Sequence, residues 1–384
     1  MKILYILNVA NRVNNFCMTS LIAAKKLNIE YHIAGNWGYE NDSELKQDEK
    51  KHDIRIHQVD FNRSPFSLKN RKAYQQLKEI VSRENFDAIH CNTPIGGLLG
   101  RLVGKKYKVK NTTYQAHGFH FYKGAPKKNW LLYYPVEKWL ARYTDAIITI
   151  NKEDYELAKT KLKLRKNGKV YYVPGVGIDT AQYTLPAKVR EEKRTELGIP
   201  HEAFLLISVG ELNKNKNNSV IISAMEKLQN KNIHYILCGV GEKQAELQDQ
   251  ADKAGLHNNV HFLGYRNDVK ELYQAADCFV MPSFREGLSR SIMEAMASGL
   301  PCVVSKIRGN TDLIDGTDGG YLCETTDVSA YAEKLNLLAN DKALREKMGR
   351  NNLITIKKFS TETVTEEIRK IYESEFADNV KDLK

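Results

Sequence analysis

The sequence contains no long apolar segment. No run approaches the roughly 18 apolar residues that a membrane-spanning helix needs. The N-terminal stretch MKILYILNVANRVNNF has one lysine before a short apolar run, and it lacks both the length of a signal-peptide h-region and a small-residue cleavage site. We therefore predict that this stretch begins with a β-strand, and that the protein is soluble or peripheral to a membrane.

Motifs for paired cysteines are also missing. The six cysteines form no C-x-x-C pair and match no metal-ligand spacing. Cys238, Cys278 and Cys302 lie in or beside apolar, strand-like runs. Buried, reduced thiols are the expected state, which suits a cytosolic protein.

Negative charge is scarce in the first half of the chain. Between Asp87 and Glu137 there is no carboxylate, but there are eight lysines and arginines. Residues 1–180 hold 31 Lys and Arg against 17 Asp and Glu, whereas the remainder holds 27 against 30. This one-sided charge indicates an anionic partner, either an acidic membrane or nucleic acid, with a solvated basic face as the alternative.

The composition allows two domains with cores of their own. Of 384 residues, 42% are hydrophobic and 27% charged. Strand-like apolar runs alternate with helical segments in 2–151 and again in 204–305, which is typical of doubly wound parallel α/β sheets. The Pro- and Gly-bearing stretch 170–185 separates the two series. We predict Rossmann-like domains over 1–180 and 181–360, followed by a C-terminal helix in 361–384.

Four strand-like runs of the second half end in glycine-bearing loops. In a parallel sheet these loops share the carboxyl edge, where ligands bind beside helix N-termini. The shared position favours a nucleotide site over the alternative of four polar surface turns. The loops are GELNKNKNNS (210–219), CGVGEK (238–243), LGYRND (263–268) and SFREGLS (283–289).

Glu286 and Glu294 stand eight residues apart, one in a loop and one in the helical pattern that follows. At about 100° per residue they lie about 80° out of register on one helix, so they are not a matched acid–base pair. If both contact a ligand, they contact different parts of it. The alternatives are a solvated loop residue for Glu286 and a capping box with Ser291 for Glu294.

The segment YQAHGFHFYKGAPKKNWLLYYPVEKWLARY (114–143) is both basic and aromatic. His117 and His120 lie in a glycine-bearing loop, and no metal-ligand pattern accompanies them. Lys123, Lys127 and Lys128 adjoin tryptophans, tyrosines and leucines. This composition suits an interfacial membrane segment and, equally, a core-packed helix with basic flanks.

The C-terminal loops together resemble one family, the retaining nucleotide-sugar glycosyltransferases of group 1, which includes bacterial polysaccharide enzymes. Glu286 to Glu294 matches the family's E-x7-E signature in its usual setting, P-S-x-x-E-G-L…E-A-M-A-x-G-x-P. The similarity extends over nearly the whole chain and is greatest in 205–315. It implies the GT-B architecture, in which two Rossmann-like domains face each other across a cleft, with the C-terminal helix packed back on the first domain.

The resemblance also implies roles for individual residues. Glu286 would bind hydroxyls of the transferred sugar, His117 would contact that sugar from the first domain, and Lys216 would hold the diphosphate. Glu294 would bind the ribose. The further donor-binding residues that the resemblance implies are Gly210, Lys214, Gly239, Gly241, Tyr265, Arg266, Gly287, Leu288 and Ser289.

At three positions the sequence departs from the family pattern, so the residues that make the corresponding contacts to the substrates are not assigned. Glu211 stands where the family usually has an arginine, so a phosphate cation is missing or is supplied by Lys214 or Arg290. The stretch NVANRVNNF replaces a glycine pair after the first strand. Asp312 occupies a position where glutamate is common.

The chemistry implied is glycosyl transfer with retention, in which the leaving diphosphate helps to deprotonate the acceptor and no metal or cofactor takes part. The expected partners are a UDP-linked nucleotide sugar, a lipid-linked diphosphate-sugar or glycan acceptor, and an anionic membrane surface, without nucleic acid. The reaction would serve exopolysaccharide or capsule assembly at the inner face of the cell membrane. The alternatives are a sugar-nucleotide epimerase, a non-catalytic sugar-nucleotide-binding subunit and a nucleic-acid-binding protein.

Overall fold

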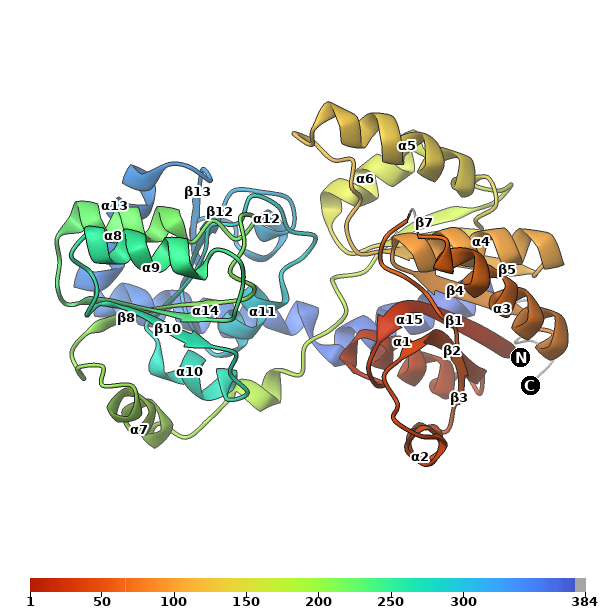
Figure 1. The fold of residues 1–384 in the computed structure, drawn as a ribbon, viewed down its shortest axis with the longest axis horizontal. Helices are drawn as coiled ribbons and strands as arrows, with labels where there is room; N and C mark the ends of the chain where they lie inside the picture. Colours follow the sequence, from red (N-terminus) through yellow and green to blue (C-terminus); the bar gives the residue numbers. More distant parts are fainter. Residues whose placement is uncertain (66, 377–384) are drawn as a thin grey trace. The chain divides into compact units, whose positions relative to one another are not determined.

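The computed structural model describes residues 1–65 and 67–376. The chain divides into two compact units (Figure 1). Unit 1 comprises Met1–Gly177 together with the segment that starts at Thr361, and unit 2 comprises Ile178–Ser360. Each unit is built on one parallel sheet with helices between the strands, so the predicted α/β class with two Rossmann-like units is confirmed.

Unit 1 has, in its described residues, a seven-stranded sheet in the order β3-β2-β1-β4-β5-β6-β7. Its strands are β1 (Lys2–Ala10), β2 (Glu30–Trp37), β3 (Arg55–Gln58), β4 (Ala88–Asn92), β5 (Asn111–Ala116), β6 (Ala146–Thr149) and β7 (Lys169–Tyr172). Its helices are α1 (Asn15–Lys26), α2 (Asp42–His52), α3 (Lys69–Glu84), α4 (Pro94–Tyr107), α5 (Lys127–Ala141), α6 (Lys152–Lys161) and α15 (Thr361–Glu375).

Unit 2 has a six-stranded sheet in the order β10-β9-β8-β11-β12-β13. Its strands are β8 (Phe204–Val209), β9 (Ile233–Cys238), β10 (Val260–Gly264), β11 (Cys278–Met281), β12 (Cys302–Ser305) and β13 (Gly320–Cys323). Its helices are η1 (Thr180–Tyr183), α7 (Lys188–Glu196), α8 (Ser219–Leu228), α9 (Gln244–Lys253), α10 (Val269–Ala275), α11 (Arg290–Ala297), α12 (Asn310–Leu313), α13 (Val328–Asn340), α14 (Lys342–Thr355) and η2 (Ile356–Phe359).

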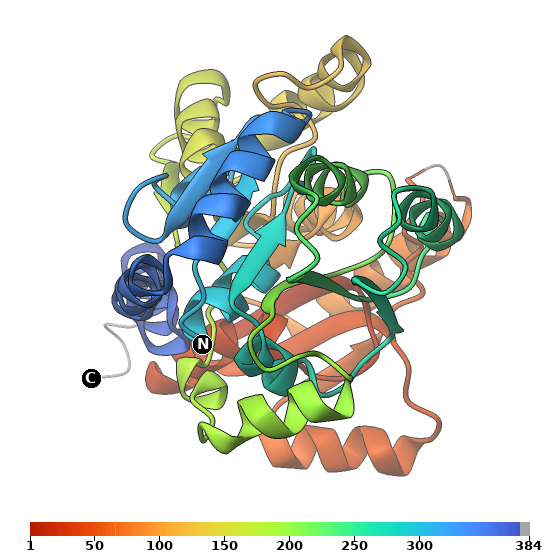
Figure 2. The ribbon, with the colours of Figure 1, turned by 90° about the vertical axis from the view of Figure 1, so that its left-hand side faces the viewer.

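Both faces of each sheet are covered, which explains why the central strands are almost continuously apolar. In unit 2, α10 and α11 pack on one face and α8, α9 and α13 on the other. Figure 2 turns unit 2 toward the viewer and shows helices on both sides of its sheet. In unit 1, α3 and α4 cover one face, and α1 and α15 cover the other.

The strand order reverses at one point in each sheet. All pairings between the named strands are parallel. In unit 1 the chain adds β2 and β3 on one side of β1, and then crosses to the other side of β1, where β4 to β7 follow. In unit 2 it adds β9 and β10 on one side of β8, and then β11 to β13 on the other. The loops after β1 and β4 therefore diverge at the carboxyl edge, as do those after β8 and β11. Such switch points are where open α/β sheets bind ligands.

The C-terminal helix α15 belongs to unit 1 and packs against α1. Its buried face includes Val364, Ile368 and Tyr372. The Tyr372 hydroxyl lies 2.6 Å from Nδ1 of His90, a fully buried residue of β4. A polar contact thus joins segments 282 residues apart in the sequence.

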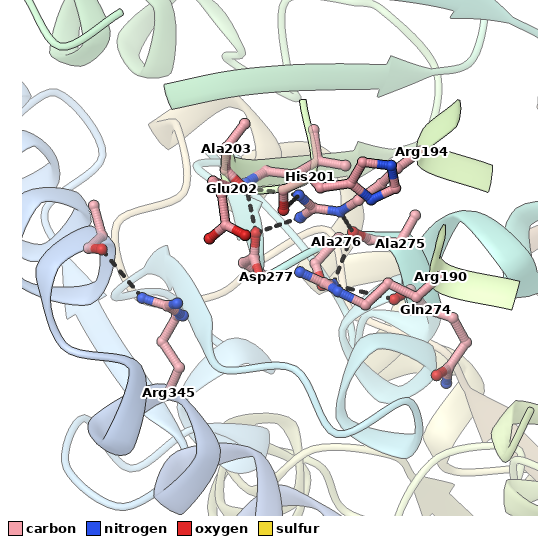
Figure 3. Close-up of polar contacts among 12 residues, drawn as sticks. Arg190, Arg194, His201, Glu202, Ala203, Gln274, Ala275, Ala276, Asp277 and Arg345 are labelled. Atoms are coloured by element: carbon pink, nitrogen blue, oxygen red, sulfur yellow. Dashed lines mark hydrogen bonds and ion pairs between the residues drawn. The ribbon is translucent and has the colours of Figure 1, made fainter. Parts of the chain in front are cut away.

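Two arginines attach helix α7 to the rest of unit 2 (Figure 3). Arg194 is 1% exposed, and its guanidinium contacts Asp277 at 2.6 Å and the carbonyl oxygen of Ala275 at 2.9 Å. Arg190 binds the other carboxylate oxygen of Asp277, also at 2.6 Å. Asp277 in turn accepts a hydrogen bond from the Leu205 N–H at 2.8 Å, so this one carboxylate connects α7 to the start of β8.

All six cysteines are buried and unpaired, which agrees with the predicted burial of Cys238, Cys278 and Cys302. Among the described residues, no helix combines the length and the hydropathy that a bilayer crossing requires.

Candidate functional site

Lys216 and Glu286 form an ion pair at the switch point of unit 2. Lys216 lies in the loop after β8 and Glu286 in the loop after β11, and the lysine Nζ is 2.8 Å from the glutamate Oε1. The two side chains are 20% and 15% exposed, so solvent shields the pair only weakly while a ligand can still reach it. The pair forms because β8 and β11 are neighbours in the sheet.

Two asparagines fasten the Lys216 loop to its surroundings. Asn215 donates from Nδ2 to the carbonyl oxygen of Arg285 at 3.0 Å. Asn217 has a left-handed backbone, with φ of 54°, and donates to the carbonyl oxygens of Pro282 and Thr325 at 3.1 and 2.7 Å. The lysine between them is therefore held by its neighbours on both sides. Sequence reasoning missed both residues, although asparagines in a loop commonly bond to nearby backbone.

Glycines let the backbones of these loops meet. A Cβ on Gly239, where φ is 147°, would lie 1.9 Å from the carbonyl oxygen of Gly210. A Cβ on Gly309, where φ is 80°, would lie 2.1 Å from that of Gly287. Gly241 is equally close to the loop after β8, at 2.3 Å from a carbonyl oxygen. No larger side chain fits at these positions, so the glycines set the spacing of the loops.

Helix α11 begins at the same edge. Ser289 is its N-cap, with an extended backbone, and its Oγ accepts a hydrogen bond from the Ile292 N–H at 3.4 Å. The alternative explanation of Glu294, a capping box with Ser291, is therefore excluded, because the extended loop ends at Ser289 and Ser291 already lies inside the first turn. The N–H groups of this first turn that lack an intrahelical acceptor, together with the helix dipole, make an anion site.

The residues just before α11 present backbone to that site. The Leu288 side chain packs against the core on the α10 and α11 face, and Ser289 is 4% exposed. Gly287 contributes no side chain. A ligand in this position would therefore meet main-chain groups of residues 287–289.

Glu294 is held by two donors. Its Oε1 accepts a hydrogen bond from Nε of Arg290 at 2.9 Å, and its Oε2 accepts one from the Tyr273 hydroxyl at 3.2 Å. Burial raises the pKa of Tyr273 well above its usual value, so the hydroxyl remains a donor. Glu286 and Glu294 thus have different partners. Tyr273 was missed because its position in α10 looks like that of an ordinary core residue.

Tyr265 and Arg266 follow β10 and differ in what they offer. The Tyr265 side chain is highly exposed, at 77%. Arg266 is engaged by two carboxylates, with Nε 2.7 Å from Asp268 and Nη2 2.9 Å from Glu196. Hydrogen bonds from Arg266 hold the pKa of Asp268 well below its usual range. The tyrosine ring, rather than the guanidinium, is the group that remains open to a planar ligand.

The structure distinguishes Lys214 from Arg290 as the cation that could contact phosphate in place of the family's arginine. Arg290 is paired with Glu294, whereas Lys214 is exposed in the loop after β8. Glu211, at the position of the family's arginine, accepts a hydrogen bond from Nδ2 of Asn213 at 3.0 Å. Lys214 is therefore the candidate whose side chain can move to a ligand without breaking the Arg290–Glu294 pair.

A buried arginine forms a hydrogen bond with the backbone of the loop that contains Glu286. Arg308 is 8% exposed and donates from Nε to the Glu286 carbonyl oxygen at 3.3 Å. It precedes Gly309, which itself contacts the same loop. The role of Arg308 was missed in the sequence, since an arginine in a loop after a strand resembles any solvated residue.

His117 belongs to unit 1, in the loop after β5. Its ring lies 4.2 Å from that of Phe16, measured between centroids, and its Nε2 is 3.1 Å from Oδ1 of Asn92. Burial lowers the pKa of His117 to about 3, so the imidazole is neutral at physiological pH. With Nε2–H donated to Asn92, Nδ1 is an acceptor. Asn92 was not recognised in the sequence.

The carboxyl edge of unit 1 also contains a strained residue. Thr93, between β4 and α4, has φ of 63° and ψ of 160°, a conformation that non-glycine residues rarely adopt. In the stretch that replaces the family's glycine pair, Asn14 caps α1 by accepting a hydrogen bond from the Phe16 N–H at 2.9 Å. This departure from the family pattern therefore serves to start α1.

Two family models match this chain. The model described as "Glycosyl transferases group 1" matches residues 189–353, and the model described as "Glycosyl transferase 4-like" matches residues 2–151. The chain is 35% identical over 376 residues to EpsD of Bacillus subtilis (strain 168), which is named as a glycosyltransferase, and the match covers 97% of this chain and 96% of EpsD.

A second relative has a more specific name. It is a UDP-Gal:alpha-D-GlcNAc-diphosphoundecaprenol alpha-1,3-galactosyltransferase of Escherichia coli, 28% identical over 294 residues, with 75% of this chain and 76% of that protein covered. Among solved structures, HepE of Anabaena in complex with UDP superposes with a TM-score of 0.79 at 20% identity, covering 97% of this chain and all of that one. This likeness shows that the fold is GT-B.

Proposed function

Because the chain belongs to the group 1 glycosyltransferases, we propose that it is a retaining hexosyltransferase with a nucleotide sugar, UDP-linked, as its donor. The observation that carries the proposal is the Lys216–Glu286 ion pair beside the N-terminus of α11. A cation and a row of backbone N–H groups suit a diphosphate, and a carboxylate next to them suits sugar hydroxyls.

The donor would lie along the edge of the second sheet. Lys216 and the first turn of α11 take the diphosphate, Glu286 takes hydroxyls of the sugar, and Glu294 takes the ribose. The exposed ring of Tyr265 flanks the base. Lys214 supplies a further positive charge in place of the arginine that Glu211 replaces.

In the reaction, the bond between the anomeric carbon and the diphosphate oxygen breaks. The acceptor hydroxyl oxygen bonds to the same face of the anomeric carbon, and its proton passes to the departing diphosphate. Lys216 and the α11 amides stabilise the negative charge that develops on that oxygen, in a site where they are already in place. Preorganised groups of this kind act on the transition state more than on the ground state.

His117 would contribute from unit 1 through Nδ1, which accepts a hydrogen bond from a hydroxyl of the transferred sugar. Its low pKa keeps that nitrogen unprotonated. Asn92 fixes the tautomer and the ring orientation.

For the acceptor we propose a lipid-linked diphosphate sugar, used during exopolysaccharide or capsule assembly. The name of the E. coli relative, which specifies a GlcNAc-diphosphoundecaprenol acceptor, supports this class. A lipid-linked acceptor places the enzyme at a membrane surface, and the six unpaired cysteines suit the reducing, cytoplasmic side.

A thermal-shift screen of UDP-, GDP- and ADP-sugars tests the donor. Stabilisation by one UDP-sugar above UDP alone is expected, because Glu286 adds contacts to the sugar. Incubation with a GlcNAc-diphosphate lipid then gives a product whose anomeric configuration is read by NMR from the proton coupling constant. Retention of the donor's configuration is expected.

The same assay separates the alternatives. An inverted product would rule out the proposed mechanism. Conversion of the donor without acceptor would identify an epimerase, and donor binding without either reaction would identify a binding subunit. Stabilisation by none of the nucleotide sugars would contradict the donor site itself.

A further inference from the structure

The outer face of α5 is built from apolar and basic residues alone. Leu131 is 82% exposed, Leu132 50%, Val136 46% and Trp139 42%. The basic residues Lys127, Lys128 and Lys138 are exposed on the same helix. At about 100° per residue, these positions cover one half of the helix circumference, about 180°.

The opposite half of α5 is bound to unit 1. Trp130, Tyr133 and Tyr134 pack against the core on the α3 and α4 face. The only carboxylate of the helix, Glu137, points inward and forms an ion pair with Arg101, which is 1% exposed. The helix is therefore rigidly seated, and its outer face carries positive charge with no negative charge of its own.

Positive charge continues beyond α5. Lys105, at the end of the neighbouring helix α4, lies with Nζ 3.7 Å from the ring centre of Tyr143, and Trp139 packs edge-on against the same ring at 5.5 Å. Helix α6, the next helix along the chain, carries the acidic residues Glu153, Asp154 and Glu156. Figure 1 shows α5 at the upper margin of unit 1, above α6.

We propose that this face of α5 is the surface by which the protein docks on an anionic lipid bilayer. Its leucines, valine and tryptophan enter the interfacial region, and its lysines contact lipid phosphates. The pattern fits because apolar side chains gain from leaving water while lysines beside them bind negative headgroups. Nucleic acid would use the lysines but would leave Leu131 and Leu132 exposed, so it fits the face less well.

This inference deepens the proposed function by naming the surface that meets the membrane of the lipid-linked acceptor. It does not depend on the donor, and binding to lipid can be measured without any reaction. Failure of the docking surface and failure of the proposed transfer are therefore distinguishable.

The test is co-sedimentation of the full-length protein with vesicles. Vesicles of phosphatidylcholine with 40% phosphatidylglycerol are compared with pure phosphatidylcholine, at low and high salt. The wild type should bind the anionic vesicles at least about tenfold more tightly, and high salt should weaken binding.

Two sets of variants locate the surface. The triple change Lys127→Gln, Lys128→Gln and Lys138→Gln should weaken binding roughly a hundredfold, since each basic residue near an anionic surface contributes about fivefold. The matched control neutralises three lysines of α2, a helix with no buried residues, through Lys46→Gln, Lys50→Gln and Lys51→Gln, and should change binding much less.

The apolar part of the face has its own control. Leu131→Ser with Leu132→Ser should weaken binding at least about tenfold, because two leucines no longer leave water. Leu353→Ser with Ile354→Ser removes a comparable exposed pair from α14, 42% and 66% exposed, and should leave binding unchanged. Vesicles should also shift the tryptophan emission of the wild type to shorter wavelength, and Trp139→Phe should remove most of that shift.

Equal binding to neutral and anionic vesicles, or equal losses in the α5 variants and their controls, would overturn the proposal. So would tighter, α5-dependent binding to a 20-nucleotide oligomer than to anionic vesicles, which would identify a nucleic-acid surface. Normal transfer to a water-soluble acceptor by the α5 variants, with reduced transfer to a vesicle-embedded one, is the expected activity result. Circular dichroism of each variant shows whether the fold is retained.

Discussion

The Nζ atom of Lys216 lies 2.8 Å from Oε1 of Glu286, although 70 residues separate them in the chain. The ion pair brings together the loop after β8 and the loop after β11. It also places opposite charges where a diphosphate and its attached sugar would meet in the proposed function. Substitutions of the two residues are therefore expected to impair different parts of donor recognition.

Replacing Lys216 should affect the nucleotide, and replacing Glu286 should affect the sugar. Lys216→Met is expected to weaken UDP binding by about tenfold or more, because a charge-assisted contact to phosphate contributes about 1.5–3 kcal/mol. Glu286→Gln should keep UDP binding, or tighten it, because a negative charge near the diphosphate is removed. It should lower kcat/KM by about a hundredfold.

Calorimetric titration with UDP and steady-state kinetics with the UDP-sugar check this pair. Lys214→Met is the control that removes a charge from the same loop, and it should weaken UDP binding less than Lys216→Met does. If Glu286→Gln lost UDP affinity as severely as Lys216→Met, the assignment of sugar to one residue and phosphate to the other would fail.

Alanine substitutions at two glycines with positive φ should distinguish the cost of backbone strain alone from the cost of strain together with a steric clash. Gly198 has φ of 66° with no heavy atom within 4 Å of a built Cβ, whereas the Cβ of an alanine at Gly309 would lie 2.1 Å from the Gly287 carbonyl oxygen. Gly198→Ala should therefore lower the free energy of unfolding of unit 2 by about 1–2 kcal/mol, the cost of a left-handed alanine. Gly309→Ala should lower the free energy of unfolding by more than this, and it should also weaken UDP binding, since the Gly287 loop must move.

Calorimetry and UDP titration of both variants give the comparison. Equal losses of stability, with UDP binding intact in both, would mean that the contact between Gly309 and Gly287 does not position the site.

Unit 1 should lose stability as the pH falls toward 5. Burial lowers the pKa of His90 to about 3 in the native protein, while an unfolded histidine has a pKa near 6.5. Between these values the unfolded chain binds a proton that the native protein does not, so the free energy of unfolding falls with decreasing pH, by up to about 1.4 kcal/mol per pH unit for this residue.

Urea unfolding at pH 7, 6 and 5, followed by tryptophan emission, measures this slope. All three tryptophans, at positions 37, 130 and 139, lie in unit 1, so the signal reports that unit. His90→Gln should flatten the slope even though it lowers stability at pH 7, whereas substitution of the exposed His257 in unit 2 should not. An unchanged slope in His90→Gln would show that His90 does not titrate as described.

The attachment of α7 should depend on the buried Arg194–Asp277 pair. Arg194→Met leaves Asp277 partly buried with one partner fewer, and removing one member of a buried pair costs about 3–5 kcal/mol. The exposed pair of Arg350 and Glu346, 3.8 Å apart, is the control, and Arg350→Met should cost less than about 1 kcal/mol.

Calorimetry of the two variants tests this difference. For a unit of this size, Tm should fall by about 2–4 °C for each kcal/mol lost. Similar Tm values for the two variants would mean that the Arg194 pair contributes no more than a surface contact.

Several elements were readable from the sequence because their signal is local. The apolar runs of β1, β4, β8 and β11 are buried on both faces, so they stand out as strands, and alternation with helices identified the parallel sheets. Helix α2 was not identified because it has no buried residue and so no apolar stripe. Its signals were the Asn41 cap, acidic residues in the first turn and basic residues in the last.

The capping of α11 shows how a local pattern can mislead. Ser289 and Ser291 are both plausible caps, and the glutamate three residues after Ser291 favoured the wrong one. The choice depended on where the loop after β11 leaves the sheet, and that is set by contacts with the loop after β8 and with Gly309. Similarly, the segment around α5 was ambiguous until its two faces were resolved into one that packs and one that is exposed.

The sequence by itself determined the α/β class, the two series of strands and helices, and the residue types available at the strand ends, since each depends on neighbouring residues and their periodicity. Only the tertiary structure decided which of those residues meet. Strand order brought Lys216 to Glu286, the packing of α10 brought Tyr273 to Glu294, and the return of the chain brought Tyr372 to His90. These contacts join residues 21 to 282 positions apart, and no local pattern records the order in which strands assemble.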